Sequence, residues 1–168
     1  MNNHVAVTIL AVAAMSLMTQ SAASGSVAAA GIGIEKESCD IPVLRHQHRD
    51  VATIEVLELE WSRAYLRGDT HFEECLLTAD FSEIMRNGDI KHLADELGFA
   101  EKNKASPLPM GETPKGTVLL HGNVAVAYGR SQGANGARAM RYADYYVWEG
   151  GHWRAYFAQQ TEIAPAGG

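Results

Sequence analysis

The sequence predicts an α+β domain in which three N-terminal helices pack on a strongly curved antiparallel sheet. Three observations support this fold class. Apolar residues recur at helical spacing from Ile54 to Tyr65. After Gly116 the chain changes to β-rich runs such as TVLLHGNVAVAYGR. The stretch RYADYYVWEGGHWRAYFAQQT then carries aromatic runs on both sides of Gly150-Gly151, which predicts a long hairpin.

Start and stop signals divide the first half of the domain into three helices. Asp50 is a good N-cap for a first helix, which Gly68 can end in the left-handed conformation. The run Thr70-His71-Phe72-Glu73 fits a capping box and starts a second helix at once. A short strand is expected over 81–85, with a turn at Asn87-Gly88. Asp89 is then expected to cap a third helix, with Ile90, Leu93 and Leu97 facing inward.

The N-terminus has the composition of a secretory signal. The first 34 residues contain no Asp, Glu, Lys or Arg, and the apolar run Val5 to Met18 is followed by small residues. We expect a signal peptide over 1–23, a linker over 24–49, a domain over 50–163 and a tail over 164–168. This predicts a secreted or periplasmic protein with no stable membrane insertion after cleavage. An uncleaved anchor is the alternative.

Net charge and cysteine content restrict the expected partners and the expected covalent links. The 168 residues carry a formal net charge of −6, which argues against nucleic acid or an anionic membrane as a partner. In an oxidising compartment the two cysteines, Cys39 and Cys75, suggest a disulfide that ties the segment before the first helix to the second helix. Two separate thiols are the alternative.

Several weak motifs follow one another in an informative order. A helix ending in RGD, a second helix running into TADF, and NGD before a third helix form one half. VAVAYG and the long hairpin form the other. Together they resemble the nuclear transport factor 2-like (NTF2-like) superfamily, in its SnoaL-like branch, from Val51 to Ile163. The resemblance implies a cone with a cavity at its open end and frequent homodimers. It also implies a range of isomerases, dehydratases, cyclases and hydrolases, so the fold does not give the function.

The register of the last hairpin predicts which side chains line that cavity. A two-residue turn at Gly150-Gly151 places Trp148 opposite Trp153, Asp144 opposite Phe157 and Tyr142 opposite Gln159. Rings with a few polar groups suit a mostly apolar ligand pocket. The expected ligand-binding residues are Trp61, Tyr65, Phe81, Met85, Tyr142, Tyr146, Trp153, Phe157 and Gln159. A one-residue slip of register would exchange the two faces.

Asp144, Tyr128 and Glu83 are the catalytic candidates. An aspartate base with a tyrosine donor is the arrangement of ketosteroid isomerase. The stretch FSEIMRNG departs from that pattern, because Met85 or Arg86 stands near the place of the base and leaves Glu83 as the nearby carboxylate. Alternatively, Asp144 ties neighbouring elements together by hydrogen bonds, with Gln159 or Tyr142 as its partner. We expect no metal site and no cofactor, because the histidines do not cluster and no phosphate-binding or dinucleotide motif occurs.

The opposite face of the hairpin suggests a partner surface. It would carry Ala143, Tyr145, Val147, Tyr156 and Ala158, an apolar strip that predicts a homodimer through the sheet. Three functions stay open: an exported domain that binds a small, mostly apolar ligand, an acid–base enzyme of the isomerase, dehydratase or hydrolase type, and a homodimeric interaction module with a filled cavity.

Overall fold

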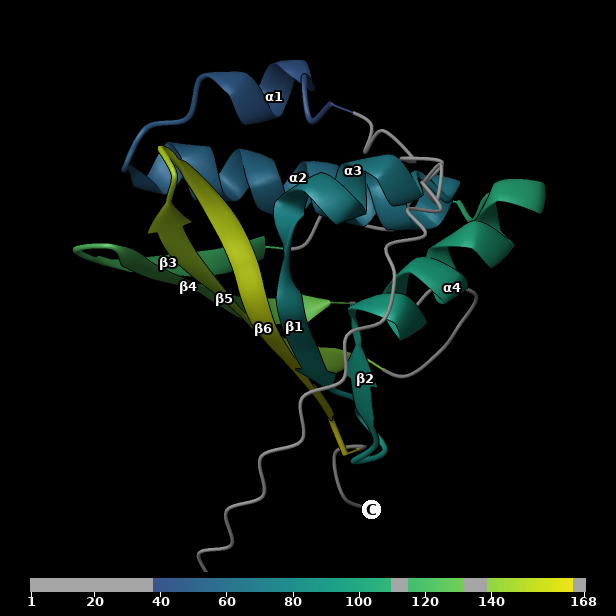
Figure 1. Cartoon of the computed structure of the whole chain (residues 1–168). Helices are drawn as coiled ribbons and strands as arrows, with labels where there is room; N and C mark the ends of the chain where they lie inside the picture. Colours follow the sequence, from purple (N-terminus) through teal and green to yellow (C-terminus); the bar gives the residue numbers. More distant parts are fainter. Residues whose placement is uncertain (1–37, 110–114, 132–138, 165–168) are drawn as a thin grey trace, which may run out of the picture. The chain divides into compact units, whose positions relative to one another are not determined.

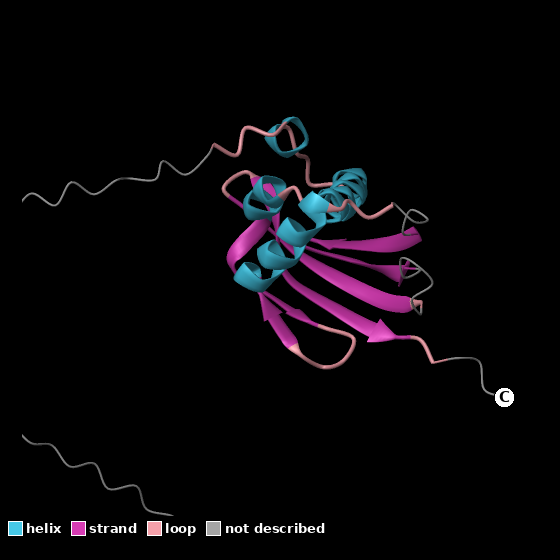
Figure 2. Cartoon of the chain, turned by 90° about the vertical axis from the view of Figure 1, so that its right-hand side faces the viewer, coloured by secondary structure: helices cyan, strands magenta, loops and turns pink. Residues whose placement is uncertain are grey.

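A six-stranded sheet with helices on one face forms the domain. The structure is a computed structural model that describes residues 38–109, 115–131 and 139–164 of the chain. The strand order is β2-β1-β6-β5-β4-β3, and every neighbouring pair is antiparallel except β1 and β6. Figure 2 shows the helices gathered on one face of the twisted sheet. The predicted α+β class is confirmed.

The elements follow one another as helices first and long strands last. The helices are α1 (Pro42–Arg45), α2 (Val51–Arg67), α3 (Thr70–Leu76) and α4 (Leu93–Ala105). The strands are β1 (Leu77–Ile84), β2 (Ile90–His92), β3 (Lys115–His121), β4 (Val124–Ser131), β5 (Met140–Glu149) and β6 (His152–Glu162), as labelled in Figure 1. The expected signal peptide and the first part of the linker lie outside the described residues. Within the described ranges, no helix has the length and apolar character needed to cross a membrane.

Helix α2 begins and ends where the sequence predicts. The Asp50 carboxylate accepts a hydrogen bond from the Thr53 amide at 2.8 Å. Gly68 ends the helix with a φ of 74°. A Cβ at this position would also lie 2.4 Å from the backbone nitrogen of Lys104 in α4, so both conformation and space require glycine here.

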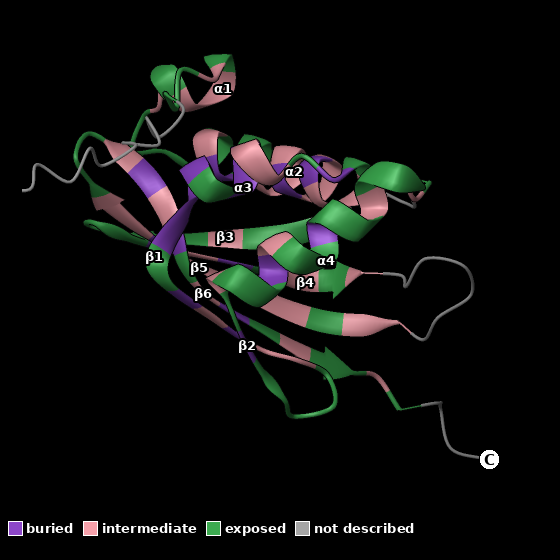
Figure 3. Cartoon of the chain, turned by 45° about the vertical axis from the view of Figure 1, so that its right-hand side comes forward, coloured by how far each residue is buried: buried purple, intermediate pink, exposed green. Residues whose placement is uncertain are grey.

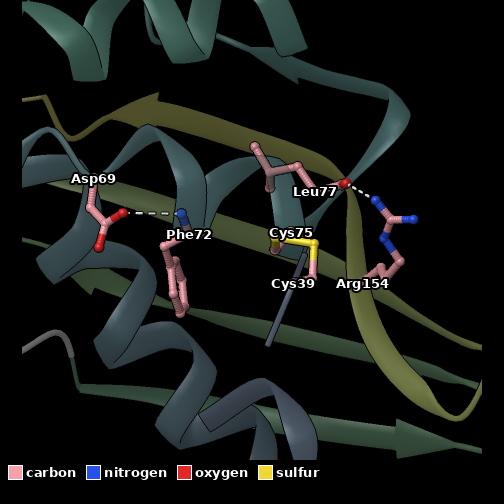
Figure 4. The surroundings of a disulfide bond; sticks show 6 residues. All are labelled: Cys39, Asp69, Phe72, Cys75, Leu77 and Arg154. Carbon is pink, nitrogen blue, oxygen red and sulfur yellow. Dashed lines mark hydrogen bonds between the residues drawn. A yellow bond between two sulfur atoms is a disulfide. The ribbon is translucent and has the colours of Figure 1, made fainter. Parts of the chain in front are cut away.

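The start of α3 differs by one residue from the expected capping box. Asp69, rather than Thr70, is the N-cap, and its carboxylate accepts from the Phe72 amide at 3.1 Å (Figure 4). Aspartate is the better acceptor for the first-turn amides, and it also carries the charge that a helix N-terminus favours.

The third long helix starts later than predicted. Ile90 to His92 pair with β1 as the edge strand β2, so Asp89 does not cap a helix and Ile90 is 64% exposed. Helix α4 begins at Leu93, where the Asp95 carboxylate accepts from the His92 amide at 3.0 Å. The backbone N–H and C=O groups of residues 90–92 need hydrogen-bond partners. Pairing with the edge of β1 supplies these partners, which an earlier helix start would have supplied otherwise.

The last hairpin follows its predicted register only near the turn. Gly150 and Gly151 both have positive φ, 57° and 90°, as a tight two-residue turn requires. Trp148 pairs with Trp153, as predicted, but the register then shifts because β6 carries one extra residue, Tyr156.

The predicted partners beyond this bulge are therefore wrong. Asp144 lies opposite Ala158 rather than Phe157, and Tyr142 lies opposite Gln160 rather than Gln159. The bulge turns the later residues of β6 to the other face, because side chains alternate along a strand.

The segment before α2, which we expected to be a linker, is attached to the domain. Cys39 and Cys75 form a disulfide with a Cα–Cα distance of 5.5 Å, shown in Figure 4. Two hydrogen bonds add to it: Gln47 Oε1 accepts from the Trp153 amide at 2.5 Å, and the Trp153 indole donates to the His48 carbonyl at 2.9 Å. Residues 39–50, including α1, thus form a strap over the Trp148/Trp153 end of the last hairpin.

The hydrophobic core lies between α2 and the sheet. Ile54, Leu57 and Ala64 of α2 are at most 1% exposed and pack in one cluster with Phe81 and Trp153. Figure 3 shows this burial as purple segments on α2, α3 and the central strands. The apolar stripe predicted on the first helix is confirmed.

Candidate functional site

One transverse row on the inner face of the sheet carries several polar side chains. The strand registers align Val118, Ala127, Asp144, Ala158, Glu83 and Lys91 across the sheet from β3 to β2. Directly paired neighbours share a face, and Ala127, Ala158, Glu83 and Lys91 are all buried. Asp144 therefore stands between two alanines, whose short side chains do not reach toward the helices.

Glu58 of α2 meets Asp144 from the helix layer. The Tyr146 hydroxyl donates to Glu58 Oε1 at 2.6 Å, and the Asp144 carboxyl, which keeps its proton, donates to Glu58. Burial raises the pKa of Glu58 to about 6, against the two hydrogen bonds that it accepts. Burial first, and the Glu58 charge second, raise the pKa of Asp144 well above its usual value. The two carboxyl groups therefore titrate as a pair that holds one proton at neutral pH.

Lys91 of β2 lies between two other carboxylates. Its Nζ is 2.6 Å from Glu83 Oε2 and also contacts Glu96 of α4. The Gln160 side-chain amide donates to Glu83 Oε1 at 2.5 Å. Burial alone would lower the pKa of Lys91, but the charges of Glu96 and Glu83 raise it above its usual value. Lys91 thus stays charged, and Glu83 uses both of its oxygens for these partners.

Glu73 of α3 is the least compensated group of the interior. It is 0% exposed, and within the described part of the chain neither of its carboxyl oxygens has a hydrogen-bond partner. Burial first, then repulsion by Glu96, raise the pKa of Glu73 to about 9, although Lys91 acts in the opposite direction. Glu73 is therefore protonated at neutral pH, which avoids a bare buried charge.

The structure brings four predicted site residues to the inner face beside this row. Asp144 and Glu83 belong to the row itself, and Tyr142 and Tyr146 flank Asp144 on the same face of β5. Tyr146 is fully buried. The Tyr142 hydroxyl fills the place of a side chain at Gly116, where a Cβ would lie only 2.5 Å away.

The other predicted residues of the helix side serve mainly the core. Trp61 contacts Phe81 and Tyr146 edge-on, with ring centroids 5.8 and 6.5 Å apart. Trp153 is 1% exposed and bound by the strap. Two predicted residues are half-buried: Tyr65, whose ring is 6.0 Å from Lys91 Nζ at the end of the row, and Met85, directly after β1.

Three predicted site residues lie on the outer face of the sheet instead. Tyr128 pairs with Ala143, one position away from the inward Asp144, and is 41% exposed. Phe157 pairs with Tyr145, and Gln159 is exposed beside Ala143. The placement of Phe157 and Gln159 on the inner face was wrong because of the Tyr156 bulge. Grouping Tyr128 with Asp144 was wrong because the two positions differ by an odd number of residues in the ladder.

Sequence reasoning missed the groups around the predicted carboxylates. The partners are Glu58, Lys91, Glu96 and Gln160, and the unpartnered Glu73 is also buried in this interior. A signal existed for two of them. Glu58 follows Ile54 by four residues and precedes Trp61 by three, and Glu96 precedes Ala100 by four, so both stand on apolar helix stripes.

Two further features of the described residues concern metal binding and the outer face of the sheet. No group of three or more His, Cys, Asp or Glu among them could hold a metal ion. An open depression of about 460 Å³ lies on the outer face. It is lined by Thr78, Ala79, Asp80, Val124, Val147, Glu149, Arg154 and Tyr156.

Comparison with known structures identifies the fold. No family model matches the sequence, and no curated protein matches it either. An NTF2-like protein from Cytophaga hutchinsonii superposes with a TM-score of 0.57 and 17% identity, over 70% of this chain and 100% of that one. An NTF2-like protein of unknown function in nutrient uptake from Rhodospirillum rubrum gives 0.50 and 20%, over 68% and 100%. A candidate ketosteroid isomerase from Parabacteroides distasonis gives 0.55 and 11%, over 73% and 96%.

The chain therefore has the NTF2-like fold, as the resemblance implied. Identities this low show the fold alone. Assignment to the SnoaL-like branch stays a prediction.

The protonation of Glu73 predicts a specific pH dependence of stability. Between its ordinary pKa of 4.5 and its folded pKa of about 9, the unfolded chain has lost a proton that the folded chain keeps. Stability therefore falls as pH rises through this range, at up to about 1.4 kcal/mol per pH unit. We expect Glu73→Gln to raise the free energy of unfolding at pH 8 by a few kcal/mol and to change it little at pH 4, measured by urea denaturation.

Glu74→Gln is the matched control, because Glu74 is the exposed neighbour on the same helix. It should leave the pH profile of the wild type unchanged. Equal profiles for Glu73→Gln and the wild type would show that Glu73 is already ionised at neutral pH in the folded protein.

Proposed function

We propose that this domain binds a small, mostly apolar molecule in a recess between α2 and the inner face of the sheet. The observation that carries the proposal is the partial exposure of the Asp144 carboxyl group on the inner face of the sheet. Burial is the main cause of its raised pKa, yet the residue is only half-buried. A partly exposed carboxyl group on the inner face of the sheet is available to a ligand that enters between α2 and the strands. Glu58 has the same combination.

The surroundings of this pair fit such a ligand. The half-buried Tyr142 provides aromatic surface on β5, and the neighbours of Asp144 on the adjacent strands, Ala127 and Ala158, have short side chains. A mostly apolar wall with a few convergent polar groups is the usual composition of a small-molecule site. Glu58 and Asp144 would bind the polar end of the molecule.

Filling the recess should remove the ligand. We expect native mass spectrometry of the protein purified from its source to show a bound small molecule on the wild type. Ala158→Leu should lose it, because the longer side chain occupies the floor beside Asp144. Ala94→Leu, at an exposed position of α4, is the matched control and should keep it. Retention of the same mass by a folded Ala158→Leu protein would contradict the proposed location.

Acid–base catalysis is the second candidate function. A pKa of about 6 places Glu58 near neutral pH, and a neighbouring carboxyl that keeps its proton gives one acceptor and one donor side by side. One structure with this fold is a candidate ketosteroid isomerase, whose reaction requires such groups. For this chain an isomerase, dehydratase or hydrolase activity is our proposal.

The catalytic candidate predicts a pH profile for turnover of the copurified molecule. With Glu58 as base, kcat/KM should rise as pH increases through about 6, because only the ionised carboxylate accepts a proton. Glu58→Gln and Asp144→Asn should each lower kcat/KM by roughly two orders of magnitude. An unchanged rate in either variant would remove that residue from the chemistry.

Export of the protein remains a proposal, supported by the uncharged leader and the Cys39–Cys75 disulfide.

A homodimer through the outer face of the sheet is likewise our proposal. The strand registers align Leu119, Val126, Tyr145 and Phe157 in one row on that face. Tyr156 and Val147 extend the strip, whereas Ala158 does not belong to it because it is buried on the inner face. Such an apolar strip is typical of a partner surface.

A single charge in this strip should dissociate the dimer. Leu119 is 57% exposed, so Leu119→Lys should fold normally but sediment as a monomer at micromolar concentration, where the wild type sediments as a dimer. Val56→Lys, at a 45% exposed position of α2, is the control and should remain dimeric. A monomeric wild type would refute the proposal.

A further inference from the structure

The interior between the helices and the sheet holds far more acid than base. Five carboxyl groups face it, one each from α2, α3, α4, β1 and β5. They are Glu58, Glu73, Glu96, Glu83 and Asp144. Among the described residues, Lys91 is the one buried lysine or arginine. The hydroxyls of Tyr65, Tyr142 and Tyr146 face the same groups and supply no charge.

Lys91 does not neutralise this excess. Its ammonium group is already bound to Glu83 and Glu96. Glu73, fully buried and without a hydrogen-bond partner in the described part of the chain, shows directly that acid groups outnumber donors here. Protons compensate for part of the excess, since Glu73 and Asp144 both keep theirs at neutral pH. A cation that entered the recess would take over this role.

The arrangement of the carboxyl groups favours an organic cation over a metal ion. No three of the described carboxylates converge closely enough to hold a metal ion. The Glu58–Asp144 pair offers two carboxyl groups side by side, and the half-buried ring of Tyr142 lies on the same face of β5 as Asp144. Two carboxylates and an aromatic surface suit an ammonium group attached to an apolar body.

We propose that the ligand of this recess is an organic amine, bound as its ammonium ion by Glu58 and Asp144, with its apolar part against the half-buried ring of Tyr142. The inference rests on the proposed ligand-binding function and names the chemical class of the ligand. It also excludes carboxylate ligands at this site, because the interior charge would repel them.

Three probes of similar size and different charge test the inference by isothermal titration calorimetry with the purified protein. They are phenethylamine (cationic at pH 7), 2-phenylethanol (neutral) and 3-phenylpropanoate (anionic). We expect phenethylamine to bind at least tenfold more tightly than either of the others. Its binding should release protons, because a bound cation favours the ionised carboxylates. The apparent enthalpy should therefore differ between Tris and phosphate buffers.

The wild type alone provides a second readout. The affinity for phenethylamine should fall as pH decreases from 8 to 5, because the carboxyl groups take up protons that compete with the cation. The affinity for 2-phenylethanol should not change. The double variant Glu58→Gln/Asp144→Asn should lose the preference for the amine, while Glu55→Gln, on the exposed side of α2, should keep it.

The outcomes separate the two proposals. Binding of 2-phenylethanol or 3-phenylpropanoate as tight as that of phenethylamine overturns the amine inference and leaves the recess proposal standing. An amine preference that survives in the double variant also overturns the inference. Failure of all three probes to bind overturns the inference, while the Ala158→Leu experiment on the copurified molecule still decides the recess proposal by itself.

Discussion

One extra residue in β6 decides which side chains of the last hairpin reach the helices. From the Gly150-Gly151 turn to Tyr146 the pairing is regular, and at Tyr156 it shifts by one. Without the bulge, Phe157 would stand beside Asp144 on the inner face and Ala158 would face outward. Bulges re-aim side chains in this way and are frequent next to functional sites. Here the bulge replaces a large ring beside Asp144 by a methyl group and turns Gln160 toward Glu83.

The acid groups of the interior oppose the stability of the fold that holds them. Each buried carboxyl either keeps a proton, as Glu73 and Asp144 do, or needs a charged partner, as Glu83 and Glu96 do. A hydrophobic side chain of similar volume at such a position is commonly neutral or stabilising by comparison. Departures from the rules of a good core concentrate where a protein functions. Five such departures facing one interior support the proposed ligand site.

Local patterns predicted the elements, but pairing between distant segments decided the site. The stripe on α2, its cap at Asp50 and the two-glycine turn depend on neighbouring residues, so the sequence alone predicts them. The edge strand β2 and the bulge at Tyr156 depend on contacts with strands elsewhere in the chain, which no local pattern shows. Asp144 was therefore placed on the correct face, while its partner was not found. Glu58 is separated from it by 86 positions and belongs to another layer.

The strap divides the last hairpin into two halves with different roles. Near the turn, Trp153 is held by Gln47 and His48, and the guanidinium of Arg49 lies over the Trp148 ring at 5.0 Å. The disulfide keeps this segment close even when its hydrogen bonds open, because it joins positions 36 residues apart.

The aromatic residues at the turn are thereby committed to the core and to the strap. Farther along β5, the inward residues are Tyr146, Asp144 and Tyr142, and the row at Tyr142 contains Gly116, Gly129 and Gln160. Gly116 leaves room for the Tyr142 hydroxyl, because a Cβ at this position would lie 2.5 Å from it. The hairpin β5–β6 extends from the strap to Glu58 of α2. Its aromatic rings therefore fill the core at the turn end, and polar groups line its inner face at the other end.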